Sequence, residues 1–175
     1  LSVTARTAGF SNVSIGNIAI PALMVVILLM YIGGAPNSSS GGIKITTVLT
    51  VLASIKSYIT GREHVEMGWN HISMRTVKRA IIVILVSFIL IFLALLILTL
   101  TEEQDFFDLL FETVSAFGTV GLSRGITPEL SFAGKIVIAL VMFAGRVGLF
   151  TFAIAVVEER KMNGYSYPEV NLMVG

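Results

Sequence analysis

The chain has 175 residues, of which 55% are hydrophobic and 13% are charged, and its formal net charge is +1. Ordinary soluble domains are about 45–50% apolar and about 25% charged, so the composition indicates a membrane protein. The sequence contains no cysteine, which excludes a disulfide framework and a thiolate metal site. Its nearly balanced charge gives no indication of nucleic-acid binding.

The first recognisable element is a short polar run, TARTAGFSNV at residues 4–13, and it occurs twice. A shift of 112 residues places it on AFGTVGLSRG at residues 116–125. The same shift, without a gap, places LLMYIGG at 28–34 on LVMFAGR at 140–146. A loop followed by a membrane helix has therefore been duplicated, which favours parallel repeats about an axis along the membrane normal. Because the chain starts with leucine and inside the first copy, we expect a piece of a longer protein.

The next element is a long apolar stretch that has to be interrupted. From Ile18 to Ile59 there are 42 residues, which as one straight helix would extend about 63 Å, twice the thickness of the bilayer core. Two spans joined by an outer loop would return the chain to its starting side. The first motif copy outside and Lys56 inside instead require a single crossing. We therefore expect residues 33–42 (GGAPNSSSGG) to break the helix at membrane depth, where serine hydroxyls can face water or an ion.

Residues 61–79 are predicted to form a cytoplasmic linker, because basic residues gather in short cytoplasmic segments. The basic residues in and next to the linker are Lys56, Arg62, Arg75, Lys78 and Arg79. Two histidines in the linker, His64 and His71, lack a nearby third ligand, so we expect them to be solvated.

The segment Ala80 to Leu100 has 21 residues without a charge, enough for a helix to cross a bilayer. It should run outward, so the acidic residues that follow are expected at the outer surface. They are Glu102, Glu103, Asp105 and Asp108.

Residues 105–119 (DFFDLLFETVSAFGT) are too few to cross a bilayer and predict a re-entrant helix of about three turns. Its C-terminal end would direct roughly half a negative charge toward a cation at the second motif copy. Backbone carbonyls of the glycine-containing loops could replace the hydration shell of the ion. The expected ion-binding residues are Thr7, Ala8, Gly9, Thr119, Val120 and Gly121.

The last apolar segment, Ile136 to Val157, should run inward and carries Arg146 near its middle. Arg146 is either a structural arginine, paired with a buried acid or helix carbonyls, or a positive charge in the ion path opposite the break.

Arg6 should point away from the ion path, with Glu112 as a candidate partner. Lys44 is expected to start the second half of the broken helix and to reach polar groups of the break.

Several of these motifs together resemble the Trk, Ktr and HKT potassium transporters, and most closely the Ktr membrane subunit. They are RTAGF at 6–10, GGAPNSSSGGIK at 33–44, SAFGTVGLS at 115–123, AGRVG at 144–148 and the terminal YPEVNLMVG. The resemblance implies an all-α membrane protein with four helix–pore-loop–helix repeats around one pore. This chain would hold the end of the third repeat (1–60), the linker (61–79), the fourth repeat (80–157) and a cytoplasmic tail (158–175).

The same resemblance implies a gate beneath the ion-binding residues, formed by an intramembrane loop opposite Arg146. Its residues would be Gly33, Gly34, Ser38, Ser39, Ser40, Gly41 and Gly42. It further implies a homodimer of membrane subunits in the cell membrane, seated on a cytosolic ring of nucleotide-binding regulatory subunits. Membrane lipid is an expected contact, whereas nucleic acid and a covalently bound cofactor are not expected.

The function predicted from the sequence is potassium uptake through a carbonyl-lined selectivity filter. An enzyme is disfavoured, because no nucleophile–base set, metal-ligand cluster or phosphate loop is present. The serious alternative is a non-transporting scaffold or permease subunit in which the re-entrant segment is a packing element. A pore protein should place Gly9 and Gly121 at one depth around one axis, and a scaffold need not.

Overall fold

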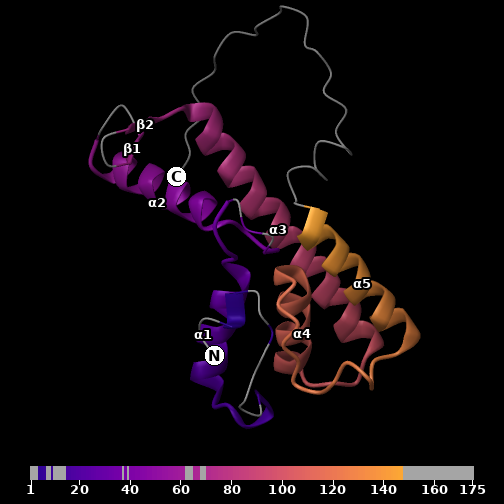
Figure 1. Cartoon of the computed structure of the whole chain (residues 1–175). Helices are drawn as coiled ribbons and strands as arrows, with labels where there is room; N and C mark the ends of the chain where they lie inside the picture. Colours follow the sequence, from indigo (N-terminus) through magenta and orange to yellow (C-terminus); the bar gives the residue numbers. More distant parts are fainter. Residues whose placement is uncertain are drawn as a thin grey trace, which may run out of the picture.

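A computed structural model describes residues 4–6, 9, 15–36, 38, 40–61, 65–67 and 70–147 of the chain. As predicted, these residues are mainly helical (Figure 1). The helices are α1 (Ile20–Tyr31), α2 (Ile45–Ile59), α3 (Met74–Thr101), α4 (Phe106–Gly118) and α5 (Phe132–Val147). Short 3-10 turns lie at Thr4–Arg6 and Ile15–Asn17.

The longest helix, α3, has 28 residues and is long and apolar enough to cross a membrane. It contains the predicted span and begins earlier, at Met74, because the Ser73 side chain caps it by accepting a hydrogen bond from the Thr76 N–H at 3.4 Å. Large apolar side chains are exposed along it, with Phe88 64% exposed. Such a surface suits contact with lipid or with other membrane helices.

The segment predicted as a linker contains a β-hairpin and the first two turns of α3. Strand β1 (Val65–Met67) pairs antiparallel with β2 (Asn70–Ile72), and His71 is opposite Glu66 in the register. The His71 side chain is exposed, as expected. Arg62 and His64 lie outside the described residues.

The predicted interruption of the first apolar stretch is present. Helix α1 ends at Tyr31, α2 begins at Ile45, and Figure 1 shows that the two helices point in different directions. We call residues 32–44 the interrupting loop. Backbone hydrogen bonds join the two ends of this loop: the Gly33 N–H donates to the Ile43 carbonyl at 2.7 Å, and the Ile43 N–H donates to the Tyr31 carbonyl at 3.2 Å.

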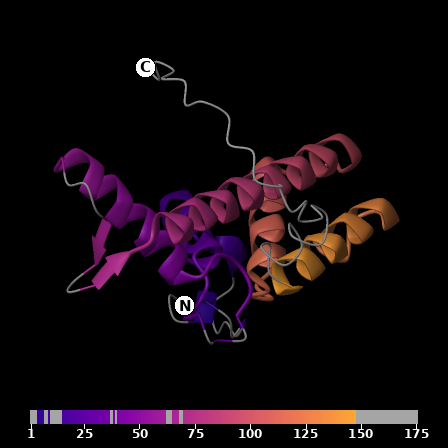
Figure 2. The ribbon, with the colours of Figure 1, turned by 90° about the horizontal axis from the view of Figure 1, so that it is seen from above.

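Helix α4 is the predicted short helix, with 13 residues. It lies between α1 and α5 in both views (Figure 1 and Figure 2), and it contacts α1, α3 and α5. Nearly every residue from Leu109 to Gly118 is buried, including Phe111 and Phe117. A helix that is apolar on most sides belongs in a protein interior, so α4 is the centre around which the other helices pack.

The duplication read from the sequence is visible in the structure. At the 112-residue offset, the first residue of α1 (Ile20) falls on the first residue of α5 (Phe132). The turn at Thr4–Arg6 falls on the last residues of α4. The copies diverge where α1 ends, because α5 continues through Arg146. Helix α5 begins four residues before the predicted Ile136, and residues 148–157 of that prediction lie outside the described residues.

Candidate functional site

The second motif copy turns sharply at the C-terminal end of α4. Thr119 adopts a left-handed conformation (φ 51°, ψ 38°) and ends the helix. Its N–H donates to the Ala116 carbonyl at 3.0 Å, and the Val120 N–H donates to the Ser115 carbonyl at 3.0 Å. The Ser115 hydroxyl then donates to the Leu122 carbonyl at 2.6 Å. The end of α4 therefore fixes the residues just after it by backbone and side-chain hydrogen bonds.

A buried carboxylate supports the same segment from behind. Glu112, in the middle of α4, is buried, and its Oε1 accepts hydrogen bonds from the Ser123 hydroxyl and, at 2.9 Å, from the Thr127 hydroxyl. Ser123 and Thr127 are themselves 3.0 Å apart at their hydroxyl oxygens. These bonds attach the loop after the motif to α4, which restricts its movement.

Asp108, Arg124 and Gly16 connect the two copies. The Arg124 guanidinium forms an ion pair with Asp108 in the first turn of α4 and donates to the Gly16 carbonyl at 3.2 Å. The two side chains are only 18% and 22% exposed. The pairing largely covers the Asp108 side chain. The predicted place of Asp108 at the outer side of the membrane stays a prediction. The arrangement cancels a positive charge close to the predicted ion path and joins loops 108 residues apart.

The first motif copy meets the second at Gly9. A Cβ atom on Gly9 would lie 2.4 Å from the Val120 carbonyl oxygen and 3.5 Å from the Gly121 carbonyl carbon. Both glycines have a positive φ, 63° for Gly9 and 84° for Gly121, a conformation that residues with a side chain rarely adopt. The two glycines aligned by the repeat therefore lie side by side. Thr7 and Ala8, the other predicted filter residues of this copy, lie outside the described residues.

The interrupting loop contacts the second motif copy directly. The Gly41 N–H donates to the Thr119 hydroxyl at 3.1 Å. A Cβ atom on Gly41 would lie 2.5 Å from that hydroxyl oxygen and 2.9 Å from the Gly118 carbonyl oxygen. Only glycine fits this approach without displacement. The loop is thus seated against the C-terminal end of α4.

Hydrogen bonds within the interrupting loop hold its shape. The Ser40 hydroxyl accepts from the Gly34 N–H at 2.8 Å, and the Ser38 hydroxyl accepts from the Ser40 N–H at 3.2 Å. Lys44, the N-cap residue of α2, donates from Nζ to the carbonyls of Ser38 (2.9 Å) and Ser40 (2.6 Å). The prediction that Lys44 reaches polar groups of the break is confirmed. Ser39 lies outside the described residues.

The sequence singled out two arginines, Arg146 and Arg6, and the structure describes the side chain of Arg146 only. Arg146 is exposed in the last turn of α5 and is close enough to Lys44 for an electrostatic interaction, so it lies on the side of the interrupting loop. The side chain of Arg6 lies outside the described part of the chain, and its proposed pairing with Glu112 stays a prediction. The described partners of Glu112 are Ser123 and Thr127.

Sequence reasoning missed the supporting residues Ser115, Thr127 and Arg124. One available signal was the spacing of Asp108 and Glu112, four residues apart and therefore on one face of α4. Polar side chains following the motif were candidates to meet that face. The family resemblance placed the loop beneath the filter, but no spacing or periodicity in the sequence linked Gly41 to Thr119, 78 residues away.

A family model described as TrkH, cation transport protein, matches residues 1–165. The chain belongs to this family. Membership confirms the resemblance found in the sequence, the all-α membrane fold, and cation transport as the function of the family. The family placement also supports a membrane location.

Among curated relatives, the chain is 37% identical over 174 residues to the Ktr system potassium uptake protein B of Bacillus subtilis, covering 99% of this chain and 39% of that protein. It is 36% identical over 181 residues to the potassium/sodium uptake protein NtpJ of Enterococcus hirae, covering 100% of this chain and 40% of that protein. The chain thus spans about two fifths of the length of these relatives.

The structure also resembles the potassium transporter TrkH from Vibrio parahaemolyticus. The TM-score is 0.74 with 19% sequence identity, over 89% of this chain and 35% of that one. This similarity supports the shared fold.

Proposed function

We propose that the chain forms part of a potassium uptake protein and contributes two of the segments that line its selectivity filter. The observation that carries this proposal is the juxtaposition of Gly9 with Val120 and Gly121 at the C-terminal end of α4. A scaffold has no need to bring the same position of two repeats into contact. Names of the relatives, a potassium uptake protein and a potassium/sodium uptake protein, support potassium as the cargo.

In the proposed mechanism, a potassium ion loses part of its water to backbone carbonyls of residues 7–9 and 119–121. Helix α4 contributes the negative end of its dipole at Gly118, where the second segment begins. Hydrogen bonds from Ser115 and to Glu112 hold that segment, so its carbonyls need little reorganisation when the ion arrives. The other filter segments would come from parts of the protein outside this chain.

The interrupting loop is the proposed gate. Its residues Gly33, Gly34, Ser38–Ser40, Gly41 and Gly42 would lie on the cytoplasmic side of the filter, with Arg146 facing them from α5. The Gly41–Thr119 hydrogen bond and the two Lys44 bonds would hold the loop in a closed position. Ile43 at the end of the loop is buried in the apolar core, but residues 33–42 carry no large apolar side chain, so a second position of that segment can lie within a few kcal/mol.

For the whole protein we propose a multi-pass homodimer in the cell membrane, controlled by a cytosolic ring of nucleotide-binding subunits. The basic residues at the start of α3 would face the cytoplasm, and α3 would span the membrane. Helices α1 and α2 would together make one crossing that the interrupting loop breaks at membrane depth, and the segment that begins with α5 would make the return crossing. Similarity to the Ktr system potassium uptake proteins B and D of B. subtilis supports membership of such a system, and the homodimer and the ring are what the family resemblance implies.

The decisive experiment is potassium uptake by the full-length gene in a bacterial strain that lacks its own potassium uptake systems. We expect growth at low external potassium and uptake of a potassium tracer. A double variant, Gly9→Ala with Gly121→Ala, should abolish uptake while the protein remains in the membrane. Expression without any uptake by the native protein would favour the scaffold alternative.

Removal of residues 36–40 tests the gate. The shortened loop should pass more potassium and respond less to the regulatory subunits, since the obstruction and the moving part are the same segment. Uptake and regulation both equal to those of the native protein would show that the loop is a spacer.

A further inference from the structure

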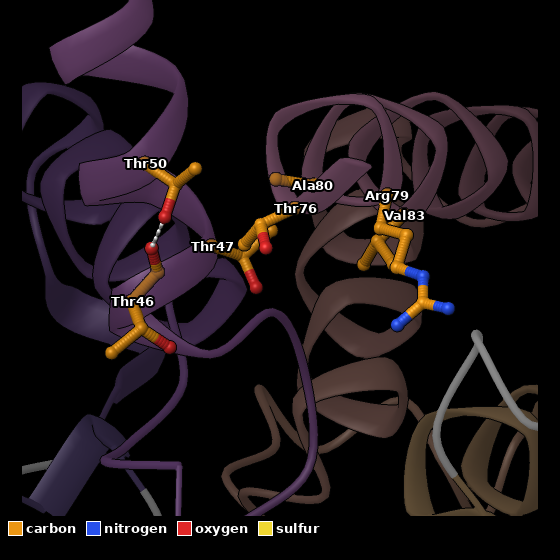
Figure 3. Close-up of a pocket in the computed structure, with 7 residues that line it drawn as sticks. All are labelled: Thr46, Thr47, Thr50, Thr76, Arg79, Ala80 and Val83. Carbon is orange, nitrogen blue, oxygen red and sulfur yellow. Dashed lines mark hydrogen bonds between the residues drawn. The ribbon is translucent and has the colours of Figure 1, made fainter. Parts of the chain in front are cut away.

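A pocket lies between the first turns of α2 and the first three turns of α3 (Figure 3). Its volume is about 290 Å³. Four threonines and one arginine supply its polar lining: Thr46, Thr47, Thr50, Thr76 and Arg79. In Figure 3 the hydroxyls of Thr46, Thr47 and Thr76 and the guanidinium of Arg79 point toward the same, lower side of the view. Polar groups from two helices therefore line one pocket.

The hydroxyl lining follows from the way α2 packs. Its buried residues are polar, Thr50 and Ser57, whereas Leu49, Leu52 and Ile55 are exposed. Thr50 satisfies its donor within the helix, by a 2.7 Å bond to the Thr46 carbonyl. Between membrane helices there is no hydrophobic force that would favour an apolar seam, so a seam of hydroxyls is stable. The pocket therefore offers hydroxyl groups beside threonine methyls and the apolar side chains of Ala80 and Val83.

The charge around the pocket selects an anion. Arg75, Lys78 and Arg79 all lie in the first two turns of α3 and are exposed, and no acidic residue lies in its first turn. Arginine and hydroxyl groups are the usual protein donors to phosphate oxygens. The volume is close to the lower end of the range for ligand sites, about 300 Å³, which suits a phosphate group and its immediate attachment.

We propose that this pocket binds the phosphate of an anionic phospholipid from the cytoplasmic leaflet, with Arg79 and the hydroxyls of Thr46, Thr47 and Thr76 as donors. In the orientation proposed above, the start of α3 lies at that leaflet, whose negative lipids attract basic segments. Next to the pocket, Ile81, Ile82 and Leu85 expose an apolar surface along α3 for the acyl chains. The proposal goes beyond ion transport and does not depend on which cation the protein carries.

Binding can be measured on the full-length protein by native mass spectrometry, in mixed micelles of phosphatidylcholine and phosphatidylglycerol. We expect selective retention of phosphatidylglycerol, and about tenfold weaker retention or more in Arg79→Gln, since a direct hydrogen bond to a charged group contributes about 1.5 kcal/mol or more. Lys78→Gln is the matched control, because it removes the same charge from the same helix outside the pocket lining. It should lose much less retention than Arg79→Gln.

Equal losses in Arg79→Gln and Lys78→Gln would overturn the proposal, because they would indicate general attraction to a charged surface. Full displacement of phosphatidylglycerol by inorganic phosphate would show that the occupant is a soluble anion and not a lipid. If Arg79→Gln is not monodisperse in size-exclusion chromatography, the double variant Thr47→Val, Thr76→Val replaces it. That variant keeps every charge, and unchanged retention in it would equally contradict the site.

Discussion

The contact between the interrupting loop and the second motif copy gives the sharpest prediction: Gly41→Ala should open the proposed gate. The added Cβ would lie 2.5 Å from the Thr119 hydroxyl and 2.9 Å from the Gly118 carbonyl oxygen. Thr119 can rotate its side chain, but the Gly118 carbonyl is backbone and cannot turn away. The loop must therefore move outward until the contact reaches an ordinary distance.

The magnitude follows from two costs. Overpacking typically costs about 1–3 kcal/mol, and loss of the Gly41 hydrogen bond to Thr119 costs about 0.5–1.5 kcal/mol more. A shift of about 2 kcal/mol against the seated position changes the equilibrium roughly 30-fold. Potassium flux of the unregulated protein should rise by up to that factor, until the open state predominates.

The assay is potassium-tracer flux into proteoliposomes that contain the full-length protein without its regulatory subunits. Gly16→Ala is the matched control, because a Cβ on the exposed Gly16 would meet no atom within 4 Å. Ser40→Ala removes the hydroxyl that accepts from the Gly34 N–H without adding volume, so a smaller increase is expected. Flux of Gly41→Ala equal to that of Gly16→Ala, in protein of equal yield, would refute the reasoning.

Three further predictions concern other parts of the site. Gly121→Ser should reduce potassium selectivity over sodium, because the new side chain enters open space at a positive φ and alters the carbonyl geometry; unchanged relative permeability would count against a filter role. Arg146→Ala should raise flux or change its voltage dependence at normal expression, whereas a loss of folded protein would indicate a structural arginine. The hydrogen bond from the Ser131 hydroxyl is the main cause that lowers the pKa of Glu102. This bond therefore stabilises the folded protein at pH values above the unfolded-state pKa of the carboxyl. The stabilisation is lost as the pH falls through the lower folded-state pKa. Ser131→Ala should therefore lower the melting temperature at neutral pH, and this difference should shrink on acidification; a difference independent of pH would exclude the linkage.

Local features of the chain were determined by the sequence itself. The charge-free run from Ala80 to Leu100 can only be a long apolar helix, and α3 contains it. The stretch from Ile18 to Ile59 is too long for one helix in a bilayer and contains a run of glycine and serine, which fixes where α1 and α2 separate. The short helix α4 and the shared start of α1 and α5 also follow from length and from the internal repeat. Each of these features depends on residues that are close to one another along the chain, so their conformational preferences can be read from the sequence.

Contacts across the chain were decided only by tertiary packing. Gly41 meets Thr119 across 78 residues, and Arg124 meets the Gly16 carbonyl across 108. Neither pair has a spacing or a periodicity that links its members, because the contact depends on how α1 and α5 pack around α4. The pocket between α2 and α3 likewise exists only because Thr50 faces inward while Leu49 and Leu52 face out. In a membrane, polarity alone does not determine which face of a helix is buried, so that orientation is set by the neighbouring helices.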